Sequence, residues 1–306
     1  MAQITASMVA ELRSKTGAGL MDCKKALNET GGDLEAAVDY LRKKGLSAAA
    51  KKSGRAAAEG AIVAAGAGSA GVIVEVNAET DFVAKNDAFC AFAKGVAEII
   101  LQHRPQDVAA LLELPFPGSN RNVGEEQVHQ IATIGENINI RRFASRAVAA
   151  GRVESYIHGA GKIGVLVELQ TEAADNAAVQ NVARQLAMHV AAANPQYLCR
   201  EQVPADVVER EKDIMRTKAI ESGKPANIVD KIIEGQVNKF FGEVCLLEQA
   251  FVMDPDTRVS ALLANLAKEV GSAVSLTGYD RYQLGEGLER RDDDFAAEVA
   301  ALTQQK

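Results

Sequence analysis

Three stretches with apolar residues at helical spacing divide residues 1–54. Glycines interrupt this spacing at 17–19 and again at 31–32, where helices are expected to end. Asp33 stands in the position of an N-cap for the third stretch. The Ala-, Lys- and Ser-rich residues 43–55 are expected to form a linker that is in part helical, with a solvated run of charge. The pattern predicts a small module of three helices that ends in a linker.

The body of the chain contains a pattern that occurs twice. Residues 71–79 and 164–172 alternate like strands, are rich in β-branched residues, and align at a constant offset of 93. A shorter strand-like stretch precedes each of them across a glycine turn, and a long helical pattern follows each. The sequence therefore predicts a duplicated α/β unit with antiparallel sheets. The third strand of each sheet is expected over 137–148 and 273–284.

The two glycine turns, 66–71 and 159–164, match the G-x-G-x-x-G pattern of dinucleotide-binding proteins. That chemistry requires a helix directly after the glycines, because the free N–H groups of the helix N-terminus hold the pyrophosphate. Here a strand follows both turns, which is the pattern of a β-hairpin. A nucleotide-dependent oxidoreductase is therefore disfavoured. The sequence also lacks the G-x-x-x-x-G-K-[ST] loop of P-loop GTPases.

Residues 204–244 carry the most regular apolar stripe in the chain. Apolar pairs recur about every four residues on both sides of the turn 222–225, which predicts an antiparallel helical hairpin inserted into the second unit. Near the end, Asp292 can cap a short amphipathic helix. Together these elements predict an α+β fold. The expected domains are the helical module with its linker (1–54), core subdomain N (55–150), core subdomain C (151–203 and 245–290), the inserted hairpin (204–244) and the C-terminal helix (291–306).

No grouping of residues in the sequence suggests a cofactor, a metal site or a catalytic centre. The cysteines (Cys23, Cys90, Cys199 and Cys245) and the four histidines are scattered, without the spacing of metal ligands or of a disulfide scaffold. Reduced thiols are expected. Neither a zinc site nor the helix of a metalloprotease is therefore indicated, and no cofactor is expected.

Charge is distributed unevenly along the chain. Residues 1–54 carry nine Lys and Arg against six Asp and Glu, whereas the remainder is acidic within a net charge of −7. An acidic body argues against nucleic acid as the main partner, because attraction to phosphates supplies most nonspecific affinity. No apolar run approaches the roughly 18 residues of a membrane span, and the N-terminus lacks a signal-peptide pattern. The expectation is a cytoplasmic protein without a membrane partner.

Phe82 is a large ring in a polar connection between the first repeated strand and its helix, beside Asp81 and close to Lys85. One interpretation is that the ring folds back and staples the start of the helix. The other is that it points outward into a partner. The second repeat reads Ala-Ala-Asp at 173–175 and keeps no comparable apolar residue. That difference favours a specific role for the ring, although spacing alone leaves both interpretations open.

Three longer motifs, residues 16–27, 80–86 and 134–138, together closely resemble the elongation factor Ts family. The likeness extends in order over the whole chain. The N-terminal helices also resemble the ubiquitin-associated (UBA-like) fold, which usually serves as a docking module. The resemblance implies a bacterial guanine-nucleotide exchange factor that binds the translation GTPase EF-Tu and promotes the release of GDP. No bond is made in that process, so no catalytic residues are required.

The resemblance also implies which residues contact EF-Tu. Asp81 and Phe82 would enter beside the magnesium site of the GTPase, so the metal that they act on belongs to the partner. The full set of implied contact residues is Thr80, Asp81, Phe82 and Val83 in the loop, Leu20 and Met21 in the N-terminal module, Ile134, Gly135, Glu136, Asn137 and His158 in the core, and Phe295 and Val299 in the tail helix.

Two alternatives stay open at this point. A non-catalytic adaptor of the UBA type would use only the N-terminal helices, which would leave the duplicated core unexplained. The hairpin at 204–244 could also pair two copies of the chain into a homodimer, although packing between its own two helices explains most of its apolar stripe.

Overall fold

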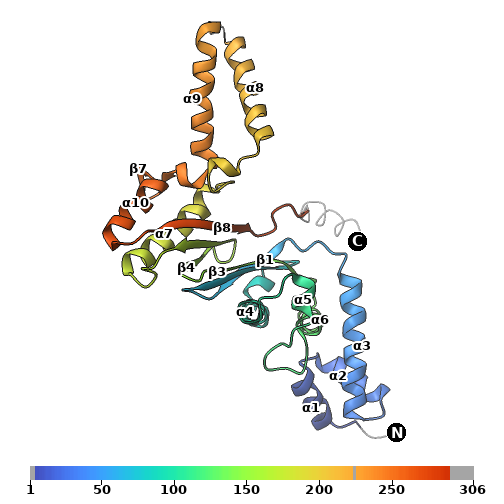
Figure 1. Cartoon of the computed structure of the whole chain (residues 1–306). Coiled ribbons are helices and arrows are strands. Elements are labelled where there is room, and N and C mark those ends of the chain that lie inside the picture. The colour runs from blue at the N-terminus through green and yellow to red at the C-terminus, as the bar shows by residue number, and fades with distance from the viewer. Residues whose placement is uncertain (1–3, 223–224, 290–306) are drawn as a thin grey trace. The chain divides into compact units, whose positions relative to one another are not determined.

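The computed structural model describes residues 4–222 and 225–289 (Figure 1). The expected C-terminal helix, 291–306, lies outside these described residues. The described chain is an α+β protein with antiparallel sheets, as predicted. The described residues form two compact units: the first comprises residues 4–63, 74–143 and 283–289, and the second comprises residues 64–73, 144–222 and 225–282.

The N-terminal residues form helices where the apolar spacing predicts them. Asp33 caps the third helix by accepting a hydrogen bond from the N–H of Ala36. Gly17 ends the first with a left-handed φ of 64°, a conformation that favours glycine. Leu12 and Leu27 are fully buried in the small core of this module. The helices are α1 (Ala6–Thr16), α2 (Leu20–Glu29) and α3 (Leu34–Lys52).

Helix α3 extends through most of the residues expected to form a linker. It continues to Lys52 because it packs along a second helix, α6 (Val123–Ile134). Gly45 is buried in this contact, where an added Cβ would lie 3.5 Å from the Cβ of Ala132. Arg42 pairs with Glu125 across the same contact. The helical part of the expected linker thus reaches Lys52, an extent that charge and alanine content could not show.

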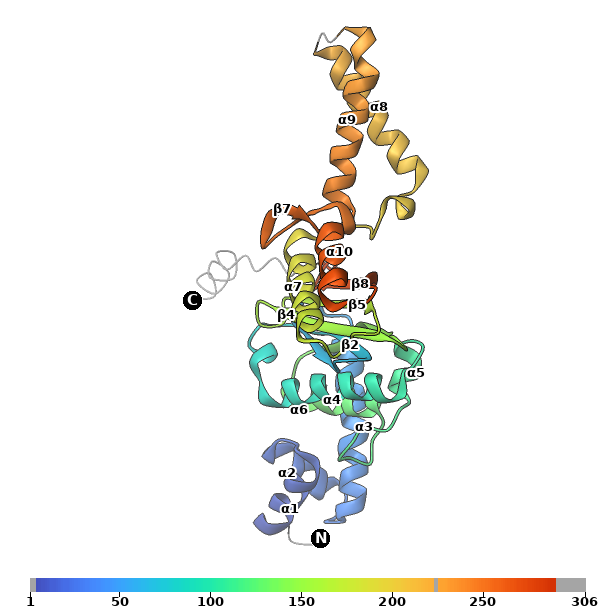
Figure 2. The same ribbon diagram turned by 60° about the vertical axis from the view of Figure 1, so that its left-hand side comes forward.

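The first sheet has the strand order β1-β2-β3, and its third strand lies where the repeat predicts it. Helices α4 and α6 lie side by side on one face of this sheet (Figures 1 and 2). Phe89, Phe92 and Ile100 of α4 are buried in the core that results. The elements are β1 (Glu59–Ala65), β2 (Ala70–Ala78), α4 (Asp87–His103), α5 (Val108–Leu112) and β3 (Ile138–Ala147).

The second unit repeats this plan with the order β4-β5-β8. Strands β4 and β5 pair in antiparallel register from Gly151↔Gln170 to His158↔Ile163. Strand β5 begins at Ile163 and β2 at Ala70, which keeps the offset of the sequence repeat. The apolar face of β5 packs on the following helix in one core. The elements are β4 (Gly151–His158), β5 (Ile163–Gln170), α7 (Ala177–Ala193) and β8 (Ser275–Gln283).

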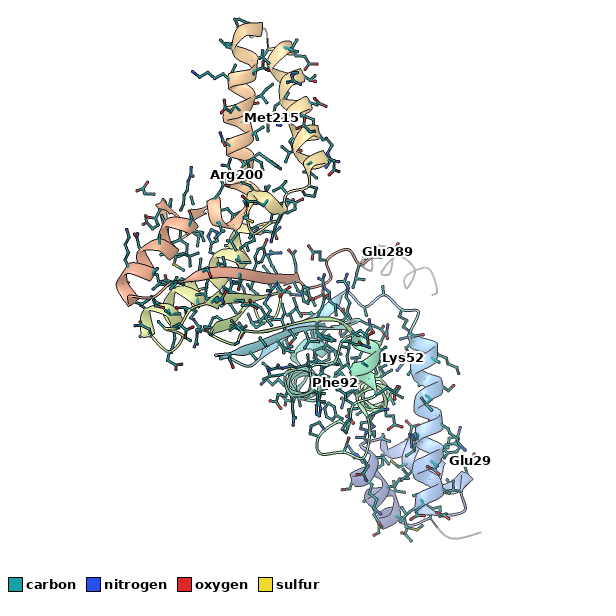
Figure 3. The ribbon with its side chains drawn as sticks, viewed as in Figure 1. Glu29, Lys52, Phe92, Arg200, Met215 and Glu289 are labelled. Carbon is teal, nitrogen blue, oxygen red and sulfur yellow. The ribbon has the colours of Figure 1, made fainter. Side chains whose placement is uncertain are left out.

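The predicted helical hairpin is confirmed as α8 (Ala205–Glu221) and α9 (Ala226–Val244). Met215 points from α8 toward α9 (Figure 3) and packs with Val229, Ile233 and Val237. The apolar stripe therefore serves mainly to hold the two helices together. No helix in the described part of the chain is long and apolar enough to cross a membrane.

The residues between the hairpin and β8 are expected to belong to core subdomain C, but the sequence predicts no helix or strand for them. They form short elements whose apolar side chains, including Leu246, Phe251 and Leu263, join the core of the second unit. The elements are η3 (Leu246–Glu248), β6 (Ala250–Phe251), β7 (Asp254–Arg258) and α10 (Val259–Val270), and a further short helix, η2 (Arg200–Gln202), precedes the hairpin.

A buried carboxylate connects β2, β3 and the segment around Gly285. Glu75 is fully buried and accepts hydrogen bonds from Arg141 (3.0 Å), Arg142 (2.7 Å) and the N–H of Gly285 (2.8 Å). Burial by itself raises the pKa of Glu75, but the bonds from Gly285, Arg142, Asn77 and Arg141 outweigh it, so the pKa is lowered from its ordinary value. The carboxylate is therefore held in its charged form inside the first unit.

Candidate partner-binding site

The connection between β2 and α4 presents Phe82 to the surface. Its side chain is 80% exposed, whereas that of the next residue, Val83, is 7% exposed. A single turn of 3-10 helix, η1 (Val83–Lys85), follows the ring, and the N–H of Lys85 donates to the carbonyl of Phe82 at 3.1 Å. The interpretation in which the ring staples the start of α4 is therefore wrong. Val83 supplies the buried side chain of this loop.

Asp81 and Phe82 project together, and we call this pair the wedge. Lys85 lies beside both members: its Nζ is 2.9 Å from Oδ2 of Asp81 and 5.9 Å from the centre of the Phe82 ring. These groups are solvent-exposed, so the ion pair contributes little stability. Asn86 fixes the far end of the loop by accepting the N–H of Ala88 at 2.9 Å as the N-cap of α4.

The near end of the loop is held by four residues from two segments, here called the clamp: Glu79, Thr80, Glu136 and Asn137. The Glu136 carboxylate accepts the N–H of Thr80 at 3.0 Å and its hydroxyl at 2.7 Å. In the opposite sense, the Glu79 carboxylate accepts the N–H of Asn137 at 2.6 Å. The wedge therefore begins directly after a residue whose backbone and side chain are both fixed.

Helix α6 ends in a way that brings the clamp together. Gly135 takes a left-handed φ of 92°, so the chain reverses direction directly before Glu136 and Asn137. The side chain of Asn137 is buried and donates to the carbonyl of Arg55 at 2.9 Å. Glu79 is absent from the residues predicted for the site. Its partner lies 58 positions along the chain, so no local pattern points to it.

Leu20 and Met21 are exposed at the start of α2, at 55% and 72%. Cys23 and Leu27 of the same helix are fully buried, so α2 covers its own core with one face and leaves two large apolar side chains on the surface. An exposed pair of this kind is typical of a small docking contact. The structure thus places both predicted residues where a partner can reach them.

The remaining predicted residues fall in different places. Ile134 is half-buried and Gly135 is exposed at the end of α6, next to the clamp. His158 is exposed at the end of β4 in the second unit, with its Nδ1 3.0 Å from the hydroxyl of Tyr156. Phe295 and Val299 lie outside the described residues.

The described histidines that are buried serve the fold. His189 is almost fully buried; its Nε2 lies 2.9 Å from Oε1 of Gln249, and its Nδ1 accepts the N–H of Val252 at 3.1 Å. Burial lowers the pKa of His189, so the ring is neutral at physiological pH. Burial likewise lowers the pKa of His129. Within residues 4–222 and 225–289, no three His, Cys, Asp or Glu side chains are grouped so that they could hold a metal ion.

The two glycine turns join neighbouring strands of the sheets and precede no helix. One connects β1 to β2, and the other connects β4 to β5 across Gly159 and Gly161, which both have positive φ. The hairpin prediction is therefore confirmed. The helix N-terminus that would bind a pyrophosphate is missing at both positions.

Comparison with known proteins gives one consistent result. A family model described as "Elongation factor TS" matches residues 79–286, a range that begins at the clamp. Among full-length relatives, "Elongation factor Ts" of Syntrophotalea carbinolica is 66% identical, over 99% of this chain and 100% of the relative. "Elongation factor Ts" of Magnetococcus marinus is 54% identical over 98% and 99%, and that of Trichlorobacter lovleyi is 55% identical over 97% and 98%.

Proposed function

This chain belongs to the elongation factor Ts family of translation elongation factors, and from that premise we propose that it is a guanine-nucleotide exchange factor for EF-Tu. In this proposal it binds the GTPase and promotes release of GDP, which sustains translation elongation. The observation that carries the proposal is the Phe82 ring, 80% exposed on a loop that is fixed at both ends. The fold of the free chain gains little from an aromatic side chain that is mostly exposed to water.

The wedge suits this task chemically. GDP is held in a GTPase by a phosphate-binding loop and a magnesium ion, so release requires that these elements be distorted. An apolar ring that enters beside them gains roughly 1.5–3 kcal/mol on full burial. Asp81, next to the ring, brings a carboxylate that competes for the magnesium ion or its water ligands. These steps make and break no covalent bond, so the proposal requires no catalytic residues.

The loss of GDP affinity that an exchange factor must cause is too large for one contact. Coupling between two ligands is reciprocal, so the factor lowers the affinity for GDP by the same ratio as GDP lowers the affinity for the factor. A ~1,000-fold loss of GDP affinity requires about 4 kcal/mol of differential binding. The ring alone supplies less than that. Leu20 and Met21 provide a second exposed apolar contact, and we assign them to docking on the G domain of EF-Tu.

Five further predicted residues keep a contact role in the proposal, whereas Val83, whose side chain is buried, does not. Ile134 and Gly135 lie next to the clamp, His158 is accessible at the end of β4, and the tail residues Phe295 and Val299 would add a contact to the G domain. The competing candidate is an adaptor that binds through Leu20 and Met21 without acting on the nucleotide. The exposure of those two side chains favours both candidates equally, whereas the wedge favours only the exchange factor.

The test is the release of fluorescently labelled GDP from EF-Tu after addition of excess unlabelled GDP. The first-order release rate is measured with increasing amounts of the full chain, and binding is measured separately with immobilised EF-Tu. An exchange factor raises the release rate until it saturates. Binding without any acceleration would support the adaptor, and the absence of binding would reject both candidates.

A further inference from the structure

Glu136 stands among the residues expected to contact EF-Tu, yet its carboxylate is turned toward its own chain. We propose that Glu136 is a positioning residue, which acts on the partner only through Thr80 and the wedge. This inference rests on the proposed exchange function and deepens it. It assigns the motif around residues 135–137 to holding the wedge in place rather than to touching the GTPase.

Both carboxylate oxygens of Glu136 are occupied by one residue. Oε2 accepts the backbone N–H of Thr80 at 3.0 Å, and Oε1 accepts the Thr80 hydroxyl at 2.7 Å. Hydrogen bonds to an ionised acceptor are shorter and stronger than neutral ones. Because one acceptor group takes both the main chain and the side chain of Thr80, it fixes the backbone two residues before Phe82.

The contact of Glu79 with Asn137 joins the same two segments a second time, with donor and acceptor exchanged. The Glu79 side chain is only 9% exposed, and its Oε1 accepts the N–H of Asn137 at 2.6 Å. The same oxygen lies 3.4 Å from Nη1 of Arg55. Each of the two segments thus donates to the other at one position and accepts from it at the next. Asp81 and Phe82 follow immediately and are exposed, so the fixed part of the loop ends where the wedge begins.

A wedge gains from being fixed before it binds. A mobile loop must be ordered when it enters a partner, and that loss of freedom reduces the free energy left for distorting the nucleotide site. The clamp removes this cost in advance, since Thr80 is already held. Gly135 must keep its left-handed conformation for Glu136 to reach Thr80, which explains why a glycine precedes the acid.

The first experiment needs no partner protein. The chain contains no tryptophan, so Phe82→Trp introduces a single tryptophan at the tip of the wedge. Excited at the red edge of its absorption band, where tyrosine absorbs little, its steady-state anisotropy reports how rigidly the loop is held. In this background, Glu136→Ala should lower the anisotropy. Glu136→Gln should largely preserve it, because the amide can accept the Thr80 N–H and donate to its hydroxyl. Glu98→Ala, which removes an exposed acid on α4, is the matched control and should change nothing.

The second experiment measures GDP release from EF-Tu at limiting factor concentration. Glu136→Ala should slow release about tenfold, the scale expected for loss of a charge-assisted hydrogen bond, and Glu136→Gln should retain most of the rate. In a background that lacks both wedge side chains (Asp81→Ala with Phe82→Ala), Glu136→Ala should cost nothing further. A charged contact to EF-Tu predicts the reverse: Glu136→Gln would lose as much as Glu136→Ala, and the loss would persist without the two wedge side chains. That result, or unchanged anisotropy in Glu136→Ala, would overturn the proposal.

The two experiments separate this inference from the proposed function. If the unaltered chain fails to accelerate GDP release, the exchange function is rejected, while the anisotropy still decides whether Glu136 holds the loop. Circular dichroism checks that each variant is folded. If Glu136→Ala does not fold, Thr80→Val removes only the hydroxyl that binds Oε1 and should lower the anisotropy in the same direction by a smaller amount. Unchanged anisotropy in Thr80→Val would then count against the proposal.

Discussion

Replacing Phe82 by alanine should separate the contribution of the ring to the stability of the free chain from its contribution to binding EF-Tu. The ring is 80% exposed, so only about a fifth of its surface is buried within the chain. Full burial of a phenylalanine is worth about 1.5–3 kcal/mol, which leaves about 0.3–0.6 kcal/mol of stabilisation in the free protein. Phe82→Ala should therefore unfold at nearly the same urea concentration as the unaltered chain.

In the proposed function, EF-Tu covers the four-fifths of the ring surface that is exposed in the free chain. On the same scale it corresponds to about 1.2–2.4 kcal/mol of binding free energy, or a loss of about 8- to 60-fold in the GDP-release rate at limiting factor concentration. The measurement is the initial slope of release rate against factor concentration. A slope is preferable to a saturated rate because it reports stabilisation of the transition state relative to the free proteins.

Val83→Ala is the matched control, since the two positions are adjacent and have opposite exposure. Val83 is 7% exposed, so loss of its two methyl groups should cost about 1.5–2.5 kcal/mol of stability, including the cavity. Exchange by the folded fraction should change little. If Phe82→Ala instead destabilises the chain as much as Val83→Ala and shows no selective loss of exchange, the ring belongs to its own core and the reasoning is refuted.

Three further outcomes are expected from the described residues. Leu20→Ala combined with Met21→Ala should weaken EF-Tu binding without changing the unfolding midpoint, and unchanged affinity would exclude α2 as a docking contact. Glu75→Gln should cost about 3 kcal/mol, because it leaves Arg142 without its buried partner. Since the pKa of Glu75 is lowered in the folded state, its stabilisation should be present above pH 4.5 and lost as the pH falls below that value, so acid unfolding curves of the two proteins should converge. Burial raises the pKa of Cys245 to about 11, so iodoacetamide at pH 8 should modify it only after unfolding, as judged by mass spectrometry.

The repeated strands and the glycine hairpins could be predicted because both depend on local order. Alternating apolar residues define a strand face, and a strand rather than a helix after Gly71 or Gly164 identifies a hairpin. Residues 246–251 escaped prediction because β6 and η3 are only two and three residues long, too short for any period to be visible. Helix α10 differs, because Val259, Leu263 and Leu266 stand at helical spacing and could have been used to predict it. Helix α3 continues to Lys52 on account of its contact with α6, a tertiary effect absent from local spacing.

Only part of the candidate site could likewise be predicted from the sequence. The loop at 80–83 and the exposed pair at 20–21 could be located from motifs, because each lies at the start or end of an element with a clear pattern. Spacing could not decide whether Phe82 or Val83 faces inward, since the answer depends on the single 3-10 turn between them and α4. The pairing of Thr80 with Glu136 bridges 56 positions and requires α6 to end at Gly135. Contacts of that range follow from the fold alone.

The base of the α8–α9 hairpin allows the arm to vary in length. The N–H groups of Gln196 and Tyr197 donate to the carbonyl of Val244 at 3.0 and 3.1 Å, and Leu246 returns a bond to Tyr197 at 2.8 Å. The entering and leaving strands of chain are thus already joined, so a tight turn could replace both helices at little closure entropy. The arm is in effect a modular extension: insertions or excisions above this joint should leave the register of β8 intact, and its reach can be adjusted while the sheet beneath it stays unchanged.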